Sequence, residues 1–384
     1  MRRSDDETFW REYRGLFPAL AERVYLNNAS NQPLPLPVAE RLHRYVDAAC
    51  RGNPEDLYTT DAHPRLRETF SRWLGCEASD LAFVSSTSDG FIKAVNAVDW
   101  RPGDAVVIPR NEFPSVVYPF EMARARGAEI RFAGEDGRPV TEGHILQALT
   151  PGTRAAAFSW VSFSTGYKID LVPFSRELKR RGVDLVFVDG MQGAGVWNPE
   201  LSATEVDFFS FQTVKWIAGP NGIGALYIKP SRLKELRNSA FSWFSVPCCD
   251  DYALLTRTDL EAFATARRFD GGTPVMIAVV GTQAYFDLLE PVGIAGVSAR
   301  MTELLNRLRG KLAGAGIKAL VSLDDPHRSS LVLLEVTDAP RTHERLRAAG
   351  VITSLRMGRI RVSPHVYNSD QDFDRLIETL REAP

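Results

Sequence analysis

The sequence predicts an α/β protein with an open sheet and a functional site at the carboxyl ends of its strands. Two observations support this fold class. Short apolar runs bounded by Gly, Pro and Asp recur along the chain and are typical of buried strands, as at 81–84, 105–109, 185–188 and 223–228. Segments with helical periodicity lie between such runs, and polar residues follow several runs directly.

Size and composition limit the class of protein. The chain has 384 residues, 44% of them hydrophobic, which allows two domains with a sizeable core. The 46 basic and 48 acidic residues give a net charge of −2, which argues against nucleic acid or an anionic membrane as partner. No apolar run reaches the roughly 18 residues of a membrane span, and the opening MRRSDDETFW lacks the apolar core of a signal peptide. Four cysteines and six scattered histidines indicate neither a disulfide framework nor a metal site, so we expect a cytoplasmic protein.

The stretch 184–228 holds the residues with the strongest chemical signal. Asp189 ends one apolar run, and Lys215 follows a second run, 206–211, among aromatic residues. Burial lowers the pKa of a lysine and makes its amine a nucleophile that forms Schiff bases with carbonyl compounds, pyridoxal phosphate among them. That cofactor also needs a carboxylate beside its pyridine nitrogen. A turn aspartate and a surface lysine are the plain alternative, but the two in this order, with Gln192 one turn further on, favour a function.

The segments VDGMQGAG and DFFSFQTVKWIAGPNGIGALYI resemble the cofactor-binding signature of the class V aminotransferase family. This family of fold-type I pyridoxal 5'-phosphate (PLP) enzymes includes cysteine desulfurases, kynureninases and isopenicillin-epimerase-like proteins. The resemblance extends from about Tyr25 to Leu380. It implies a large domain with a mostly parallel seven-stranded sheet sandwiched by helices, plus a small C-terminal α+β domain. We expect an N-terminal arm at 1–20, a large PLP-binding domain at 21–273, and an interdomain helix with the small domain at 274–384.

The N-terminal elements follow from their apolar spacing. Residues 1–20 read as an amphipathic helical arm, and residues 24–26 as a short strand followed by a Pro-rich turn. Asn28 falls on a segment that resembles the part of the family that lines the substrate end of the pocket. Paired asparagines in a turn are more often turn residues only.

The strand 81–84 leads through SSTSDG into a helix at 90–98. Hydroxyl groups and free backbone N–H groups at a helix N-terminus form an anion site. An ordinary N-cap explains one such residue, whereas three hydroxyl residues in a row favour phosphate. By resemblance, Thr87 and Ser88 are the phosphate-binding pair.

Two further strands end in loops that we place at the site. After strand 105–109, Phe113 takes the position of the family residue that stacks on the cofactor ring, in a kynureninase-like context. An aromatic face contributes about 1 kcal/mol beyond burial, but a phenyl ring cannot shuttle protons as the desulfurase histidine does. After the run at 154–161, Ser162 stands where family members carry Asn or Gln, so its contact with cofactor or substrate is only weakly indicated.

The resemblance also assigns roles within the central stretch. Asp189 keeps the pyridine nitrogen protonated so that the ring draws electrons from Cα, and Gln192 hydrogen-bonds the phenolic oxygen. Gln212 stands where the family has a phosphate-binding serine. Lys215 forms the imine with the cofactor and, once released, is the catalytic base at Cα. In RFDGGT, Thr273 matches a residue that reaches the phosphate of the neighbouring subunit, which implies a homodimer with shared active sites.

The last third of the chain predicts a long helix at 274–289 and a unit with helices at 298–312 and 342–349 and strands at 330–335 and 359–362. Arg361 matches the family arginine that binds the substrate α-carboxylate through its two-pronged guanidinium. A lone arginine on a strand is usually a surface residue, but the flanking match favours function. His365 lies close by and is a candidate lining residue.

The sequence indicates the reaction type less directly than it indicates the cofactor. Cysteine desulfurases carry a nucleophilic cysteine in a mobile loop before the arginine, and AGVITSLRMGRIRVS has neither the cysteine nor room for the loop. We interpret Cys248 and Cys249 as structural or incidental. The expected protein is therefore a PLP-dependent aminotransferase or β-eliminating (C–S type) lyase acting on an amino acid, with an epimerase or a decarboxylative or aldol-type enzyme as alternatives. A non-catalytic binding protein would be expected to lack Asp189 or Lys215, and a nucleotide-binding protein needs a Gly-rich fingerprint that SSTSDG does not supply.

Overall fold

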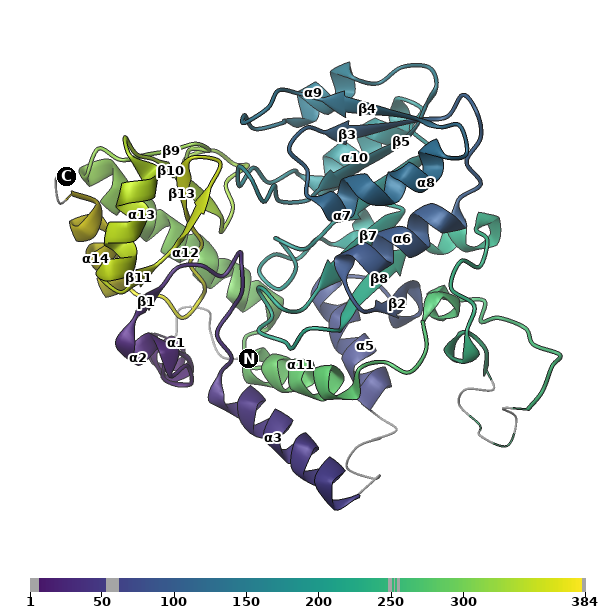
Figure 1. The fold of residues 1–384 in the computed structure, drawn as a ribbon, viewed down its shortest axis with the longest axis horizontal. Helices are drawn as coiled ribbons and strands as arrows, with labels where there is room; N and C mark the ends of the chain where they lie inside the picture. The colour runs from purple at the N-terminus through teal and green to yellow at the C-terminus, as the bar shows by residue number, and fades with distance from the viewer. Residues whose placement is uncertain (1–6, 53–61, 248–250, 252, 254–255, 382–384) are drawn as a thin grey trace.

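A computed structural model describes residues 7–52, 62–247, 251, 253 and 256–381. Its centre is a seven-stranded sheet in which β8 alone runs antiparallel to its neighbours (Figure 1), so the predicted mostly parallel α/β fold is confirmed. In spatial order the strands are β2 (Leu81–Val84), β8 (Gly224–Ile228), β7 (Phe208–Gln212), β6 (Leu185–Asp189), β5 (Thr153–Ser159), β3 (Ala105–Pro109) and β4 (Glu129–Ala133).

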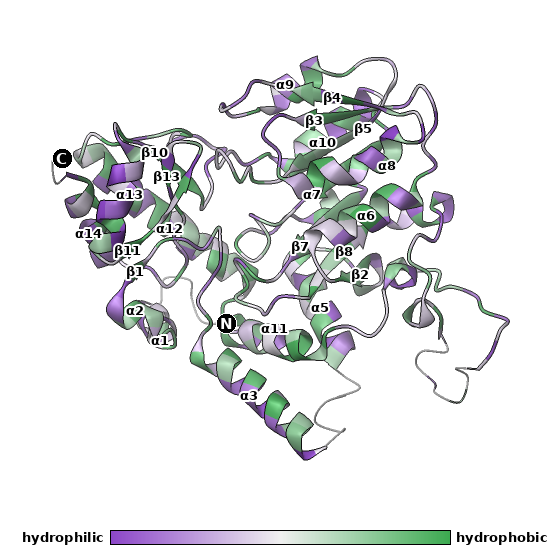
Figure 2. Ribbon diagram, in the orientation of Figure 1, coloured by the Kyte–Doolittle hydropathy of each residue, from purple (hydrophilic) through white to green (hydrophobic). Residues whose placement is uncertain are grey.

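Both faces of this sheet are covered, which explains why most of its strands read as continuous apolar runs. One face packs against α6 (Thr87–Ala97), α7 (Pro114–Val117) and α8 (Glu121–Arg124). The other packs against α5 (Ala62–Leu74) and α10 (Leu171–Arg180). Figure 2 shows helices that carry both hydrophobic and hydrophilic residues along their length, as helices with one buried face should. The edge strand β4, with the sequence EIRFA, is the least buried of the seven, and its pattern did not predict a strand.

A second unit follows α11 (Met276–Leu289), which packs on α5 and on α3 (Leu36–Arg51). It lies beside the large sheet (Figure 1). It contains a four-stranded antiparallel sheet and three helices: β9 (Lys318–Ala319), β10 (Val332–Glu335), β12 (Ser354–Arg356), β13 (Arg359–Val362), α12 (Gly293–Gly314), α13 (Ala339–Ala348) and α14 (Asp370–Arg381). The short α9 (Glu142–Gln147) packs near β3 and β4 in the large unit.

The N-terminal segment joins this second unit. After α1 (Glu7–Gly15) and α2 (Ala19–Glu22), β1 (Val24–Tyr25) pairs in parallel with β11 (Val351–Ile352). The Arg14 guanidinium lies 2.7 Å from Asp372 on α14, and Arg300 on α12 lies 2.8 Å from Glu7. Residues 7–25 are therefore held by elements that lie at least 293 positions later in the chain.

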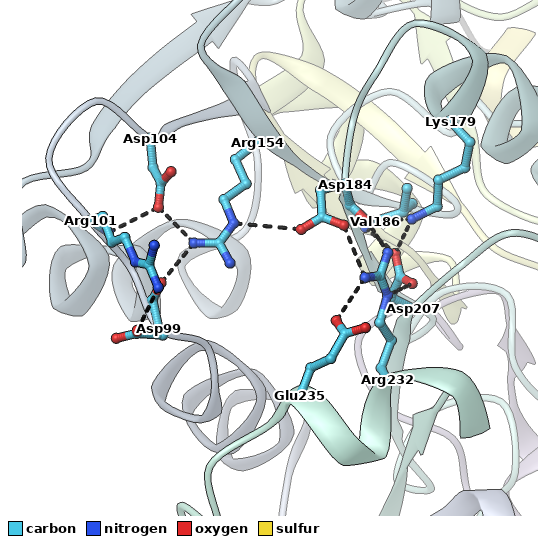
Figure 3. Close-up of polar contacts among 10 residues, drawn as sticks. All are labelled: Asp99, Arg101, Asp104, Arg154, Lys179, Asp184, Val186, Asp207, Arg232 and Glu235. Atoms are coloured by element: carbon cyan, nitrogen blue, oxygen red, sulfur yellow. Dashed lines mark hydrogen bonds and ion pairs between the residues drawn. The ribbon is translucent and has the colours of Figure 1, made fainter.

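The two ends of the large sheet differ in chemistry. Near the amino ends of β6 and β7, the fully buried Asp207 accepts from Lys179 at 2.6 Å and from Arg232 at 2.8 Å (Figure 3). The Val186 N–H donates to the same carboxylate, and Arg154 lies between Asp104 and Asp184 (Figure 3). These charges are paired with one another, whereas the carboxyl ends carry polar side chains around a cavity.

No helix within the described ranges is long and apolar enough to cross a membrane. In the same part of the chain, no group of three or more His, Cys, Asp or Glu side chains has the arrangement of a metal site. Cys248 and Cys249 lie outside the described residues.

Candidate active site

A cavity of about 210 Å³ lies at the carboxyl ends of the central strands. It brings together most of the cofactor-binding residues that the sequence indicates: Thr87, Ser88, Phe113, Asp189, Gln192, Gln212 and Lys215. Its other lining residues are Ser86, Ser115, Ser159, Phe163, Met191 and Val214. Residues separated by more than 100 positions thus meet because parallel strands deliver their carboxyl ends to one edge.

Lys215 is positioned in the turn that follows β7. Its Nζ lies 5.8 Å from the centre of the Phe113 ring. Burial lowers the pKa of the Lys215 amine to about 8, and the positive charges of Arg361 and Arg356 act in the same direction, while the Asp189 carboxylate opposes them. A sizeable fraction of the amine is therefore neutral, and nucleophilic, near physiological pH.

Asp189 is the last residue of β6 and is 4% exposed. Burial raises the pKa of this carboxyl to about 6, against the lowering effects of the Met191 N–H and of Lys215. The Met191 N–H donates to Oδ1 at 2.7 Å. The side chain is thus fixed at the cavity wall by its own turn, and it is ionised at neutral pH in spite of its burial.

The N-terminus of α6 forms another wall. The helix begins at Thr87, three residues earlier than the sequence predicts, because the Ser86 hydroxyl accepts the Asp89 N–H at 3.1 Å and caps it. Ser88 Oγ lies 2.6 Å from Ser115 Oγ, and Gln212 donates to the Ser85 carbonyl at 3.2 Å. Free N–H groups and hydroxyls at the start of an eleven-residue helix suit an anion.

Gly90 sets how closely α6 approaches the sheet. A Cβ at this position would lie 2.1 Å from the Ser210 hydroxyl oxygen on β7. A side chain here would force the helix outward, away from the strand that leads to Lys215. The absence of a side chain at Gly90 therefore fixes the helix N-terminus against the cavity.

Phe113 presents an aromatic ring to the cavity and is 43% exposed, which is high for a large apolar residue in a pocket. The ring of Phe163 packs against it edge-on, with centroids 5.3 Å apart. An aromatic ring that is supported at its edge and open elsewhere can stack on a planar ligand.

The sequence did not single out Glu112, which precedes Phe113. Its carboxylate accepts the Ser159 N–H at 2.7 Å and the Ser159 hydroxyl, and thus ties the end of β3 to the end of β5. Burial raises its pKa to about 7, and the neighbouring Asp189 charge adds to this rise. The available signal was an acid three positions after the end of a buried strand. Its partner Ser159 is recognisable only once β3 and β5 are paired.

Gln192 is held between two partners. Its Nε2 donates to the Ala29 carbonyl at 3.1 Å, and its Oε1 accepts the Trp216 Nε1–H at 2.9 Å. The amide is thereby oriented at the cavity wall, next to the residue that follows Lys215 in the chain.

Other predicted residues lie around the cavity rather than in its lining. Arg361, which is 2% exposed, donates to Ser354 Oγ at 3.1 Å, to Ser30 Oγ at 2.6 Å and to the Phe163 carbonyl at 3.4 Å. Burial lowers its pKa to about 10, and Arg356 contributes to this. Its contact with Phe163, which does line the cavity, places it at the cavity edge, and Ser162 precedes Phe163 and bonds with Ser164 at 3.0 Å.

Three more predicted residues are not part of the lining. Asn28 accepts the Tyr367 hydroxyl proton at 2.6 Å and donates to the Ser363 carbonyl at 2.8 Å. The fully buried His365 stacks on Trp216 and has Nε2 3.1 Å from that residue's carbonyl, and burial lowers the pKa of the imidazole to about 4. Thr273 lies in a loop, is exposed, and does not line the cavity.

These parts together define a class of enzyme. An amine of lowered pKa, a buried carboxylate, an open aromatic ring and a helix N-terminus that suits an anion are the groups that bind an aldehyde cofactor carrying a pyridine ring and a phosphate. The residues present therefore fit PLP.

The comparisons with known proteins agree. The model of the aminotransferase class-V family matches residues 24–376, so the chain belongs to this family and is a PLP-dependent transferase or lyase. Isopenicillin N epimerase of Streptomyces clavuligerus is 26% identical over 97% of each chain. A probable cysteine desulfurase of Methanothermobacter thermautotrophicus is 26% identical over 95% of this chain and 96% of its own. A C-DES mutant structure with glycine covalently linked to the PLP cofactor superposes with a TM-score of 0.84, at 21% identity over 96% of this chain and 99% of that one.

Proposed function

We propose that the protein converts an α-amino acid by removing its Cα proton, as an aminotransferase or a β-eliminating lyase. The observation that carries this proposal is the Lys215 amine, with its lowered pKa, beside both Asp189 and the ring of Phe113. When bound, PLP draws electrons from the Cα of an amino acid attached to it. The protein must then hold the cofactor, orient the substrate and move one proton.

We assign each role to a residue at or around the cavity. Lys215 anchors the cofactor and is the base that accepts the Cα proton, since its pKa of about 8 keeps part of the amine neutral. Asp189 binds the pyridine nitrogen, and Gln192 the phenolic oxygen. Phe113 stacks on the ring. The phosphate is bound at the N-terminus of α6 by Thr87 and Ser88, with Gln212 beside them.

We assign the α-carboxylate to Arg361. A buried guanidinium without a carboxylate partner among the described residues is costly unless a ligand supplies the negative charge. Asn28, Ser162 and His365 then support this end of the pocket. Two of them are engaged within the fold, Asn28 with Tyr367 and His365 with Trp216.

The hairpin before Arg361 argues against a persulfide-forming mechanism. Strands β12 and β13 are joined by Met357 and Gly358, both with positive φ, 48° and 71°. Such a two-residue turn leaves no mobile loop, and the hairpin contains no cysteine. Transamination and β-elimination need no such thiol. Epimerisation is the alternative, because one relative is named an isopenicillin N epimerase and inversion at Cα needs only removal and return of the Cα proton.

We further propose a cytoplasmic homodimer with shared active sites. Thr273 is exposed, and it follows Gly272, which has open space around its Cβ position, and Gly271, where a Cβ would meet only the Lys93 amine at 3.6 Å, so this loop can approach a second subunit. In such a dimer, Thr273 reaches the phosphate of the partner's cofactor. The division into an arm at 1–20, a PLP-binding domain at 21–273 and a smaller domain at 274–384 belongs to the same proposal.

The test begins with the cofactor. Protein purified with PLP should be yellow, and borohydride should fix the cofactor on the peptide that contains Lys215. Lys215→Ala should abolish that label. A protein that stays colourless with added PLP would reject the proposal and favour a non-catalytic binding protein.

The reaction type is then read from products. An amino-acid panel that yields an oxo acid and the pyridoxamine form of the cofactor indicates transamination. Pyruvate and ammonia without the pyridoxamine form indicate β-elimination. Loss of optical activity without either product indicates epimerisation.

A further inference from the structure

The hairpin β12–β13 places three arginines on one face. In an antiparallel pair, directly opposite residues share a face, and so do residues two positions apart on one strand. Arg356 is opposite Arg359, and Ser354 is opposite Arg361. The same-face pairing of the last two is seen directly, because Arg361 donates to Ser354 at 3.1 Å.

The opposite face of the hairpin is apolar and packs into the core. Leu355 is opposite Ile360, which is fully buried, as is Val362. The apolar face cannot turn outward without losing this burial. The arginine face is therefore fixed toward the large unit, where Arg361 contacts the Phe163 carbonyl at the edge of the cavity and Ser30 from the N-terminal segment.

No carboxylate among the described residues neutralises this face. Within that part of the chain, Arg356, Arg359 and Arg361 form no ion pair with an acid. Arg356 donates only to the Leu355 carbonyl, and Arg359 only to the Met357 carbonyl at 3.4 Å. Elsewhere on the described surface, arginines commonly have an acidic partner, as Arg180 has in Glu177. One substrate carboxylate would satisfy Arg361 alone.

Arg356 is the second cation, after Arg361, whose charge acts on the site. Its charge acts on both the Lys215 amine and the Arg361 guanidinium, whereas Arg359 has no such effect on either group. Side chains in a diagonal relation across a strand pair are about 7–8 Å apart, which is the relation of Arg356 to Arg361. The two guanidinium groups can therefore bind two different anionic groups of one molecule.

Resting on the proposed function, we infer that Arg356 is a specificity residue that binds an anionic group on the substrate side chain. The substrate class is then an α-amino acid with an acidic side chain, such as a carboxylate, sulfinate or phosphate. Arg361 binds its α-carboxylate, and Arg356 binds the distal acid.

The experiment compares matched acids and amides on the PLP-loaded protein. Aspartate against asparagine, glutamate against glutamine, and phosphoserine against serine are titrated while the cofactor spectrum reports the dissociation constant. We expect at least one acidic member to bind about 10- to 100-fold more tightly than its neutral counterpart, the range of a charge-assisted hydrogen bond. Equal binding within every pair overturns the inference.

Three variants and one control variant assign the effect to a residue. Arg356→Gln should remove the preference for the acid and leave the affinity for the amide unchanged, and Arg356→Lys should retain part of the preference. Arg361→Gln should weaken acid and amide alike. Arg359→Gln is the matched control, because it removes the same charge from the same face.

The outcomes separate this inference from the proposed function. A preference that disappears equally in Arg356→Gln and Arg359→Gln reflects general positive charge and overturns the assignment to Arg356, as does a preference that survives Arg356→Gln. If no amino acid changes the cofactor spectrum, the proposed function itself fails. If amino acids change the spectrum without any preference for acids, only the present inference fails.

Discussion

Replacing Asp189 by asparagine should make the apoprotein more stable and the enzyme inactive. The pKa of this buried carboxyl is about 6, whereas an aspartate in an unfolded chain has a pKa of about 3.9. The folded state thus binds the proton more tightly. The stability that this proton contributes is fully present below about pH 3.9 and is lost as the pH rises through about 6.

The size of the effect follows from the shift. About two pKa units at about 1.4 kcal/mol per unit amount to roughly 3 kcal/mol at neutral pH. An asparagine side chain at this position carries no charge to desolvate, so D189N should raise the free energy of unfolding by up to that amount. At pH 5 the difference in free energy of unfolding between D189N and the parent protein should be roughly half of its full value. The full value should be reached by about pH 8. Activity should fall sharply, because an amide cannot hold a proton on the pyridine nitrogen.

The assay is urea unfolding of PLP-free protein at several pH values, at one protein concentration, beside an activity measurement on the PLP-loaded form. Asp207→Asn is the matched control, because this carboxylate is also fully buried but is paired with Lys179 and Arg232. It should destabilise the protein by up to about 3–5 kcal/mol, the range for a broken buried ion pair, because the half-buried Lys179 loses its acid and Arg232 keeps, among the described residues, only Asp184 and Glu235. Two results would show that burial of the Asp189 charge does not dominate the pKa of this carboxyl. One is a D189N variant that is no more stable than the parent protein, and the other is extra stability that does not grow between pH 5 and pH 8.

Three further outcomes follow from the site. The rate of PLP attachment to the apoprotein should rise about tenfold from pH 7 to pH 9 and then level off, because the pKa of Lys215 is about 8. A rise of about a hundredfold over the same range, continuing above pH 9, would indicate a solvated amine with a pKa near 10.4. Gly90→Ala should weaken PLP binding and lower the melting temperature, because the new Cβ would meet the Ser210 hydroxyl. The control is Gly310→Ala, in open space on α12, which should stabilise the protein by about 0.5–1 kcal/mol. Phe113→Ala should increase PLP dissociation about 2- to 10-fold without changing the fold seen by circular dichroism, and unchanged release would show that the ring does not stack.

Much of the fold is predictable from short-range patterns. The strands Leu81–Val84 and Ala105–Pro109 begin and end where the apolar runs do, because each run is bounded by turn or capping residues. The edge strand Glu129–Ala133 escaped prediction because an edge strand needs only one protected side and tolerates charges. The pairing of Val24–Tyr25 with Val351–Ile352 has no local signal at all.

The candidate site shows the same division. Thr87, Ser88, Asp189 and Lys215 stand in contiguous motifs, so sequence reasoning predicts them, and the cavity does bring them together. Their chemical roles remain predictions. Glu112 and Ser159 become partners only through the pairing of β3 with β5, which no motif records.

Asn28 and His365 lie in segments that resemble family motifs, but their side chains are buried in the fold and do not line the cavity. The Tyr367 hydroxyl bonds to Asn28, and the Trp216 carbonyl bonds to Nε2 of His365, each from a position distant in sequence. Short-range patterns predict which segments reach the site, and long-range packing decides which side chains of those segments face it.

The parallel pairing of β1 with β11 has a consequence for synthesis of the chain. Arg361 is held in part by Ser30, and Arg14 by Asp372, 358 positions later. Residues 7–25 leave the ribosome long before β11 and α14. They therefore lack these partners while the large sheet assembles. The carboxylate-binding end of the pocket therefore forms only after Arg361 has left the ribosome, and a nascent chain that already holds Asp189 and Lys215 still lacks the geometry to select an amino acid.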